Sequence, residues 1–213
     1  IGSITPSQSP IKIGTVTGNF SATNNGSGDI NLSFANAATI GGALLSTNSG
    51  DIQIYSGDEL TISGDISCNN LTLEAEKSIK NNASGVTLTT ATGKTLTLSA
   101  KEGIGETDSA LSLSSEKIVA NSTTGLIFLS NNKTADFDVA TTANNIILKS
   151  TGFTFTNVQT DGEGTISIAP DTSTGSIDIS PADSLMRMEI QENEALNVNF
   201  RSNTAGIRIE NLF

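Results

Sequence analysis

A five-residue phrase recurs along this chain: a glycine and a polar residue, followed by an apolar–polar–apolar triplet. It reads Gly28-Asp29-Ile30-Asn31-Leu32, then Gly50-Asp51-Ile52-Gln53-Ile54, and later Gly175-Ser176-Ile177-Asp178-Ile179. Alternating apolar and polar residues are typical of a half-buried β-strand, and the glycine is typical of the turn before it. A strand and a turn repeated end to end predict a solenoid, which buries the apolar side of each repeat against its neighbours.

The spacing of the triplets separates two all-β architectures. A sandwich pairs its strands antiparallel through short hairpin turns, whereas a parallel β-helix stacks each strand on the equivalent strand of the next coil, about 4.8 Å along the axis. Every second or third triplet closes a period of about 20 to 25 residues, marked by Ile30, Ile52, Leu71 and Leu96. This period and the very short strands favour a parallel β-helix of roughly eight to ten coils.

The apolar triplets give the expected positions of the strands. They lie near 11–13, 30–34, 52–54, 60–62, 71–73, 86–88, 96–98, 111–113, 118–119, 126–129, 137–139, 146–148, 153–155, 166–168, 177–179, 188–190, 196–200 and 207–209. Asparagine pairs such as Asn69-Asn70, Asn81-Asn82, Asn131-Asn132 and Asn144-Asn145 fall where corners are expected, because asparagine tolerates turn geometry.

Two segments of different character are expected. Residues 1–180 form the shaft of the β-helix, and residues 181–213 form atypical terminal coils, or a cap, that continue the same solenoid. The second segment breaks the Ser/Thr-rich pattern with residues such as Met186, Arg187, Met188 and Glu189. Terminal repeats of solenoids commonly deviate in this way.

Composition excludes several functions. The net charge of −11 repels phosphate backbones, so nucleic-acid binding is not expected. The chain has no histidine and one cysteine, Cys68, which excludes an intrachain disulfide, a zinc site of Cys and His ligands, and Cys/His catalysis. We interpret Cys68 as a small, buried or half-buried residue at the end of a strand.

Carboxylates are the residues to consider for a hidden site. Asp29 and Asp51 occupy equivalent places in two repeats, and Asp58 and Asp65 lie nearby. Stacked acidic side chains could hold calcium, but each Asp could equally open the turn before its strand. We favour the turn, because no single coil supplies several carboxylates together with a base. No catalytic, cofactor-binding or metal-ligating residue is therefore assigned, no cofactor is expected, and the chain is not expected to be an enzyme.

A longer stretch carries a resemblance to a known family. Leu96-Thr97-Leu98-Ser99-Ala100 is followed by Gly103-Ile104-Gly105 and then by Ala110-Leu111-Ser112-Leu113, and the phrase from Ala120 to Asn131 continues it. These lines resemble the β-helical shaft of filamentous-haemagglutinin-type adhesins, the large exoproteins of Gram-negative two-partner secretion. A weaker similarity, Phe34-Ala35-Asn36 followed by Ile40-Gly41-Gly42, is to polymorphic outer-membrane autotransporters.

The resemblance implies a fold, a location and partners. It implies a right-handed, three-faced parallel β-helix that is secreted and displayed at the bacterial cell surface or outer membrane, where it mediates adhesion and contributes to virulence. The implied partners are a receptor or glycan on a host or neighbouring cell and the outer-membrane transporter of the parent protein. Two other functions stay open: a carbohydrate-active β-helix enzyme, and a subunit of an extracellular filament that self-associates end to end through its open coil edges.

Overall fold

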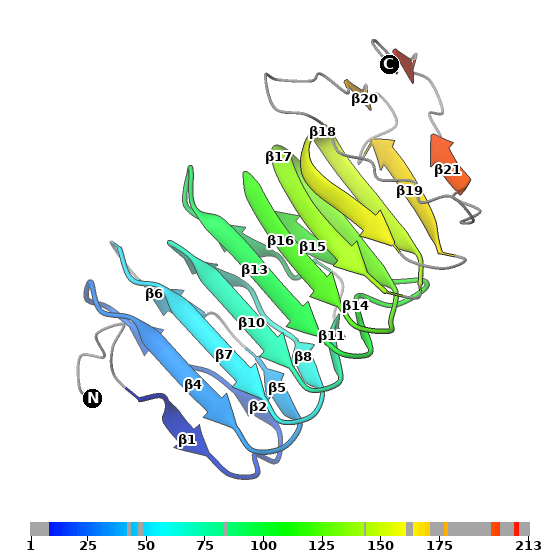
Figure 1. Cartoon of the computed structure of the whole chain (residues 1–213). Helices are drawn as coiled ribbons and strands as arrows, with labels where there is room; N and C mark the ends of the chain where they lie inside the picture. The colour runs from blue at the N-terminus through cyan, green and yellow to red at the C-terminus, as the bar shows by residue number, and fades with distance from the viewer. Residues whose placement is uncertain are drawn as a thin grey trace.

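The computed structural model of the chain is an all-β solenoid of about 7 turns (Figure 1). It describes residues 9–41, 44–46, 49–82, 85–142, 144–160, 164–170, 177–178, 197–200 and 207–208. None of these residues is helical. All pairings between the named strands are parallel, and the strands stack in order from the N-terminus, β1 beside β4, toward β19 and β21 at the far end.

The first five coils carry three short strands each, one on each face of the solenoid. The first face contains β1 (Ile11–Ile13), β4 (Ile30–Phe34), β7 (Ile52–Ser56), β10 (Leu71–Ala75), β13 (Thr95–Ala100) and β16 (Lys117–Ser122). The second face contains β2 (Asn19–Phe20), β5 (Ala38–Ile40), β8 (Leu60–Ile62), β11 (Ser78–Asn81) and β14 (Gly103–Ile104). The third face contains β3 (Thr23–Asn24), β6 (Leu44–Ser46), β9 (Ile66–Cys68), β12 (Leu88–Thr90) and β15 (Leu111–Ser114).

Later coils replace three strands by one. The 15-residue strand β17 (Ile127–Thr141) pairs in turn with β14, β15 and β16, so a single strand follows all three faces. β18 (Ile146–Thr160) lies on it with register shifts at two places, and β19 (Thr165–Pro170) and β21 (Asn197–Phe200) follow. A separate pair joins β20 (Ile177–Asp178) to β22 (Ile207–Arg208).

The register places like residues on like residues. Ile30 pairs with Ile52, Ile52 with Leu71, and Leu71 with Leu96, so the four residues that mark the period in the sequence form one column of the stack. The column continues through Ile118 and Phe137. The predicted all-β parallel β-helix is thereby confirmed, and most of its coils have 18 to 25 residues, as the pairs Leu111–Leu129 and Leu73–Leu98 show.

Apolar side chains alternate into one continuous core. Leu96, Leu98 and Ala100 of β13 are buried, whereas Thr95, Thr97 and Ser99 between them are half-buried on the outer side. Isoleucine and leucine fill most of the interior, and rings of Phe137, Phe153 and Phe155 gather within β17 and β18. Aliphatic columns of this kind fill a narrow interior without the large aromatic core of a globular domain.

One corner of the interior is lined with polar side chains. Cys68 Sγ donates to the carbonyl of Asn70, Ser115 Oγ to that of Lys117, and Ser150 Oγ to that of Gly152, each two residues further along. These residues lie at the end of the third face in every second coil, where the chain turns toward the first face, and Thr90 and Asn131 occupy this corner in the coils between them. In each case the side chain gives a hydrogen bond to a backbone carbonyl at the bend, which helps to satisfy the hydrogen-bonding groups of the backbone there.

Asn131 is a fully buried member of this corner and makes several hydrogen bonds to backbone groups. Its amide oxygen accepts from Ser115 N at 3.0 Å, and its amide nitrogen donates to the carbonyls of Ser115 at 3.0 Å and Lys133 at 2.6 Å. Asn131 has no exposed surface. The sequence predicted a corner at Asn131-Asn132, and Asn131 does lie at a bend of β17, but its side chain points inward.

The structure differs from the sequence-based expectations in the number of turns and the number of strands, and it does not test the expected division of the chain. The solenoid has about 7 turns, fewer than the eight to ten expected, and few residues beyond Pro170 are described. β2, β3, β5, β6, β9, β11 and β14 were missed, since they are two to four residues long and mostly lack an aliphatic triplet. The predicted division into 1–180 and 181–213 falls on a region where few residues are described, and it stays a prediction, as does the strand near 188–190.

Candidate functional site

A ladder of Asp and Asn side chains runs along the corner before the first face. Asp29 Oδ1 accepts from the backbone N–H of Asp51 at 2.8 Å, one coil later. Asp51 Oδ1 accepts in turn from the backbone and side-chain N–H groups of Asn70, both at 3.0 Å. Asn70 Oδ1 then accepts from Thr95 N at 3.0 Å. Each side chain thus binds the backbone of the next coil, where its strand is about to begin.

The other two candidate aspartates also have partners in adjacent coils. Asp65 Oδ1 accepts from Thr87 N at 2.8 Å, which repeats the ladder contact at the corner before the third face. Asp58 pairs with Lys77, Nζ to Oδ1 2.9 Å. This geometry agrees with the interpretation of the aspartates as turn and corner residues. In the described part of the chain, no three His, Cys, Asp or Glu side chains gather as a metal would require.

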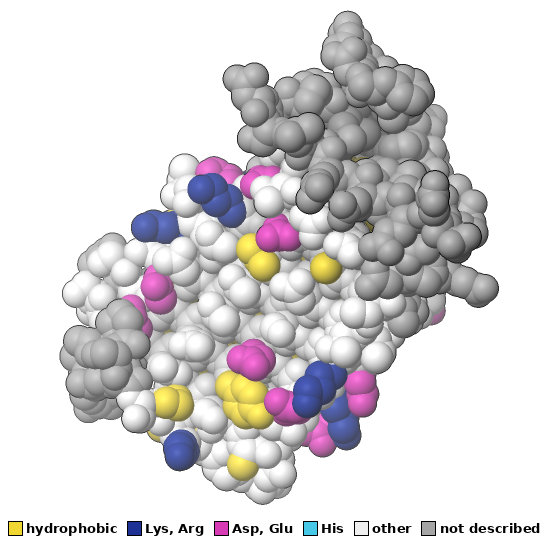
Figure 2. All heavy atoms as spheres, in the orientation of Figure 1, with side chains coloured by type: hydrophobic (Ala, Val, Ile, Leu, Met, Phe, Trp, Pro, Cys, Tyr) yellow, Lys and Arg dark blue, Asp and Glu magenta, His cyan; other side chains and the backbone are white. Residues whose placement is uncertain are grey.

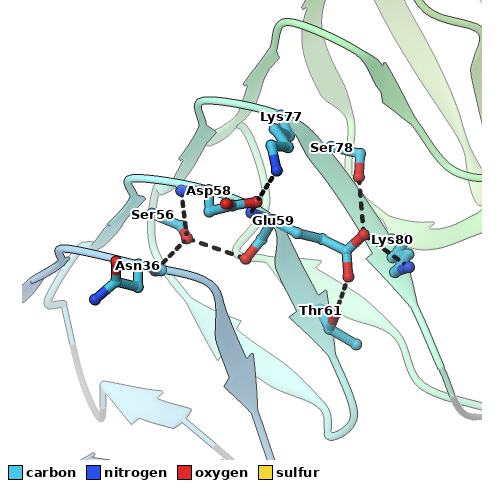
Figure 3. A network of polar contacts seen from close by, with 8 residues as sticks. All are labelled: Asn36, Ser56, Asp58, Glu59, Thr61, Lys77, Ser78 and Lys80. Atoms are coloured by element: carbon cyan, nitrogen blue, oxygen red, sulfur yellow. Dashed lines mark hydrogen bonds and ion pairs between the residues drawn. The ribbon is translucent and has the colours of Figure 1, made fainter. Parts of the chain in front are cut away.

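A group of charged side chains lies where the first face turns into the second. Figure 3 shows acidic side chains from one coil pointing to lysines of the next: Asp58 to Lys77, and Glu59 to Lys80. The Lys80 Nζ to Glu59 Oε2 distance is 2.7 Å, and a second carboxylate, Glu106 of the following coil, lies 3.7 Å from the same nitrogen. These ion pairs therefore connect three successive coils.

Neutral side chains hold the acidic groups in place. Ser56 Oγ donates to the carbonyls of Asn36 and Glu59, both at 3.0 Å, and so fixes the backbone on either side of the bend. The carboxylate of Glu59 accepts from Thr61 Oγ1 at 3.2 Å and from Ser78 Oγ at 3.3 Å. Figure 3 shows both hydroxyls converging on Glu59 from different strands. The charged groups are ordered by hydrogen bonds as well as by their counterions.

A second set of contacts joins Tyr55, Glu76 and Lys101. Tyr55 Oη donates to Glu76 Oε1 at 3.2 Å, and Lys101 Nζ pairs with Glu76 Oε2. The lysine holds the pKa of the Glu76 carboxyl below its usual value, and the tyrosine hydrogen bond adds to this. Partial burial and the hydrogen bond to Glu76 both raise the pKa of Tyr55.

The ion pairs of this surface also move several pKa values toward the charged form. Lys77 lowers the pKa of Asp58 by hydrogen bonding, and Asp58 in return raises the pKa of Lys77. Glu59 raises the pKa of Lys80, and Glu76 raises that of Lys101. Each of these shifts strengthens the charged form at neutral pH, which suits fixed ion pairs. A general acid or base instead requires a pKa moved toward the working pH.

Cys68 does not offer a reactive thiol. It is the last residue of β9, is 6% exposed, and donates from Sγ to the Asn70 carbonyl at 3.2 Å. Burial raises the pKa of the thiol to about 12, whereas a nucleophilic cysteine needs a lowered pKa. The interpretation of Cys68 as a small buried residue at a strand end is confirmed.

Comparisons with protein-family models, with curated proteins and with solved structures return no match to this chain. Within the described residues there is also no helix of the length and apolarity needed to cross a membrane. The arguments on function therefore rest on the geometry of the solenoid itself.

The sequence singled out one acidic residue of this surface and missed its other carboxylates and its lysines. Asp58 was a candidate, but Lys77, Lys80 and Lys101 were not considered. The usable signal is spacing: Lys77 follows Asp58, and Lys80 follows Glu59, by about one coil, the same distance that separates the apolar triplets. In a solenoid of known period, opposite charges one coil apart predict ion pairs along the axis.

Proposed function

We propose that this chain is a non-enzymatic, structural and adhesive segment of a secreted protein displayed at a bacterial cell surface. The observation that carries the proposal is the unbroken column of buried apolar residues from Ile30 to Phe137, paired coil by coil. Parallel backbone pairing over the same coils makes every strand part of one stack. Such an arrangement suits a stiff rod that holds a contact surface away from the cell.

The exterior supports a contact role over a catalytic one. Asp29, Asp51 and Asp65 are engaged with backbone N–H groups, and Asp58 and Glu76 with lysines. Figure 2 shows a front face of mainly uncharged polar side chains and backbone, with the charged side chains in separate groups. A polar, regular face of this kind offers repeated hydrogen-bonding groups to a partner.

An attachment assay tests the adhesive role. Beads carrying the 213-residue chain are incubated with cultured epithelial cells and with bacterial cells, and bound beads are counted. We expect more attachment than with beads carrying the Leu98→Asp variant, whose stack is disrupted. Equal attachment of the two bead types, after far-UV circular dichroism has confirmed that the variant is unfolded, contradicts the proposal.

A cleavage assay tests the non-enzymatic part of the proposal. The chain is incubated with acidic and neutral polysaccharides, with and without calcium, and new reducing or unsaturated ends are measured. We expect no increase over a heat-denatured sample. A sustained increase that scales with protein concentration would show that the chain is a carbohydrate-active β-helix enzyme.

A further inference from the structure

A shallow groove of about 320 Å³ crosses the ends of the first-face strands in the later coils. Four outward residues form one wall: Ser99 of β13, Asn121 of β16, Ala140 of β17 and Gln159 of β18. These residues are paired with one another in successive coils. The wall thus runs parallel to the solenoid axis, and three coil spacings give it a length of about 14 Å. Ala140 is the smallest side chain in the row and leaves a recess between the two amides.

The floor of the groove is polar and almost fully buried. Ser122 is 5% and Thr141 2% exposed, and both contact Gly125: its N–H donates to Ser122 Oγ at 3.1 Å, and its carbonyl accepts from Thr141 Oγ1 at 3.0 Å. Gly125 permits this packing because a Cβ there would lie 1.7 Å from the Glu102 carbonyl oxygen. In the described part of the chain, the Ser122 hydroxyl accepts this bond and donates none, so its proton is available to a ligand in the groove.

The opposite wall continues the same chemistry without charge. Thr123 and Thr142 follow the floor residues, and Thr142 Oγ1 donates to the carbonyl of Thr123. In the preceding coil, the position equivalent to Thr123 is Lys101, which pairs with Glu76 one coil further back. The groove therefore begins where the charged surface ends. All nine residues that line it are serine, threonine, alanine, asparagine or glutamine.

The polar, uncharged lining of the groove favours some classes of ligand over others. The strands beneath the groove already pair on both sides, since β16 lies between β13 and β17, so an extended peptide has no free strand edge to join. The lining offers no large apolar side chain to anchor a protein partner and no charge to bind an anion or a cation. Hydroxyl and amide groups repeated at each coil suit a ligand that carries hydroxyls at a similar repeat along an extended chain.

We propose that this groove binds an extended, neutral glycan chain of a contacted cell surface, with Asn121, Gln159 and Ser122 as its hydrogen-bonding groups. The inference names the ligand class of the adhesive surface proposed above and rests on that function. Because lining and ligand are both uncharged, binding is independent of ionic strength. Acidic polysaccharides are disfavoured by the net charge of −11.

The test uses the whole chain labelled with ¹⁵N and titrated with three neutral hexasaccharides, made of β-1,4-glucose, β-1,4-mannose and α-1,4-glucose. Hexagalacturonate serves as the acidic comparison. We expect at least one neutral sugar to shift the side-chain amide signals of Asn121 and Gln159 in a saturable way, equally at low and high salt. The variant Ala140→Leu fills the recess and should weaken the affinity about tenfold, equivalent to 1.4 kcal/mol.

Two variants keep the test decisive. Ser33→Leu introduces the same side chain in the same outward column, far from the groove, and should bind as the unmodified chain does. Asn121→Ala removes an exposed amide, so it provides a second groove variant if Ala140→Leu fails to fold. The proposal is overturned if no neutral hexasaccharide shifts these signals, if hexagalacturonate or an unrelated peptide shifts them more, or if Ser33→Leu weakens binding as much as Ala140→Leu.

The outcome is separable from that of the adhesive function. Bead attachment that persists in Ala140→Leu and Asn121→Ala contradicts the proposed glycan-binding role of the groove but leaves the adhesive function of the chain standing. Sugar binding in the groove without any bead attachment supports the groove as a glycan site and contradicts the adhesive function.

Discussion

The coils around β7 to β11 and those around β15 to β18 solve one problem in two ways. In both regions the chain must bend between faces while each coil stays in register with the next. The earlier coils are connected at their outer surface, where Asp58, Glu59 and Glu76 pair with lysines of the next coil. The later coils are connected inside, where Asn131 donates to the carbonyl of Ser115 and Ser150 to that of Lys133, each in the preceding coil.

The two kinds of connection are expected to contribute differently to the free energy of unfolding. Exposed ion pairs are screened by salt and are worth little individually. Buried hydrogen bonds cost little to keep but much to break, because the abandoned partner is left unsatisfied. Removing the exposed ion pairs, the outer connection, should therefore change stability little, whereas removing the buried hydrogen bonds, the inner connection, should destabilise the chain. The variants below test this comparison, beginning with the apolar interior that both regions share.

The largest effect is expected from a charge in the shared interior. Leu98 has no exposed surface, so Leu98→Asp buries an unpaired carboxylate and should cost about 4 kcal/mol or more, enough to disrupt neighbouring coils. Thr97→Asp is the matched control, since Thr97 is half-buried on the outer side of the same strand. Thermal unfolding followed by circular dichroism measures both. An unchanged Tm in Leu98→Asp would refute the register described here.

The inner connection is tested at Asn131. Asn131→Ala leaves the buried N–H and C=O of Ser115 without partners and should destabilise by about 2–3 kcal/mol. Asn132→Ala, at the exposed neighbouring position, should stay within about 0.5 kcal/mol of the unmodified chain. Urea unfolding gives both values. If the two variants are equally stable, the buried corner does not hold the later coils together.

A smaller effect is expected from the ladder at the first-face corner. Asp51→Ala removes an acceptor shared by two N–H groups of Asn70 and should cost about 1 kcal/mol, as the loss of a capping side chain does. Asp51→Asn retains a carbonyl oxygen at the same place and should recover most of this loss. Failure of asparagine to do better than alanine would mean that the charge, not the hydrogen bonds, matters at this corner.

The outer connection should give the smallest effect. Lys77→Gln and Lys101→Gln each remove one exposed ion pair, and we expect a fall in Tm smaller than that of Asp51→Ala. Raising the salt concentration to 1 M should abolish the difference from the unmodified chain. A larger loss in these variants than in Asn131→Ala would reverse the comparison between the two regions.

The pH dependence of the same pairs follows from their pKa directions. Asp58 and Glu76 have lowered pKa values, so their contribution is present above the ordinary carboxyl pKa and is lost as the pH falls through the lowered values, below about pH 4. Lys77, Lys80 and Lys101 have raised pKa values. Their contribution is present at neutral pH and is lost as the pH rises through these values. Tm measured from pH 2 to 11 should show a plateau between the two limits, and Lys77→Gln should flatten the acidic side.

The fold could be predicted from the sequence because the apolar triplets repeat with the period of one coil. Ile30, Ile52, Leu71 and Leu96 stand at the distances that stacking requires, and the structure pairs these residues. Strands such as Asn19–Phe20 and Gly103–Ile104 were not readable, since they carry one or two apolar residues and are held by the coils beside them. The 15-residue strand β17 was predicted as two strands, at 126–129 and 137–139, because a corner was expected at Asn131-Asn132 between them.

The surface was less readable than the interior. Alternation identifies which residues face outward, but it does not give the distance along the axis between side chains from different coils. Gly125 illustrates this limit: in the sequence it is one glycine among 20, yet its close approach to the Glu102 carbonyl shapes the floor of the groove. Asn121 likewise becomes a candidate ligand residue only when Ala140 is placed beside it.

Parallel stacking also has a consequence for how the molecule folds. Each strand contacts the equivalent strand one coil away, as Leu73 contacts Leu98, 25 residues later. The separation between contacting residues is therefore set by the coil and not by the length of the chain. Folding rates fall as that separation grows relative to chain length, so adding coils does not by itself make the topology harder to reach. A chain of this design can complete its first coils before the last residues are available, and each finished coil becomes the template for the one that follows.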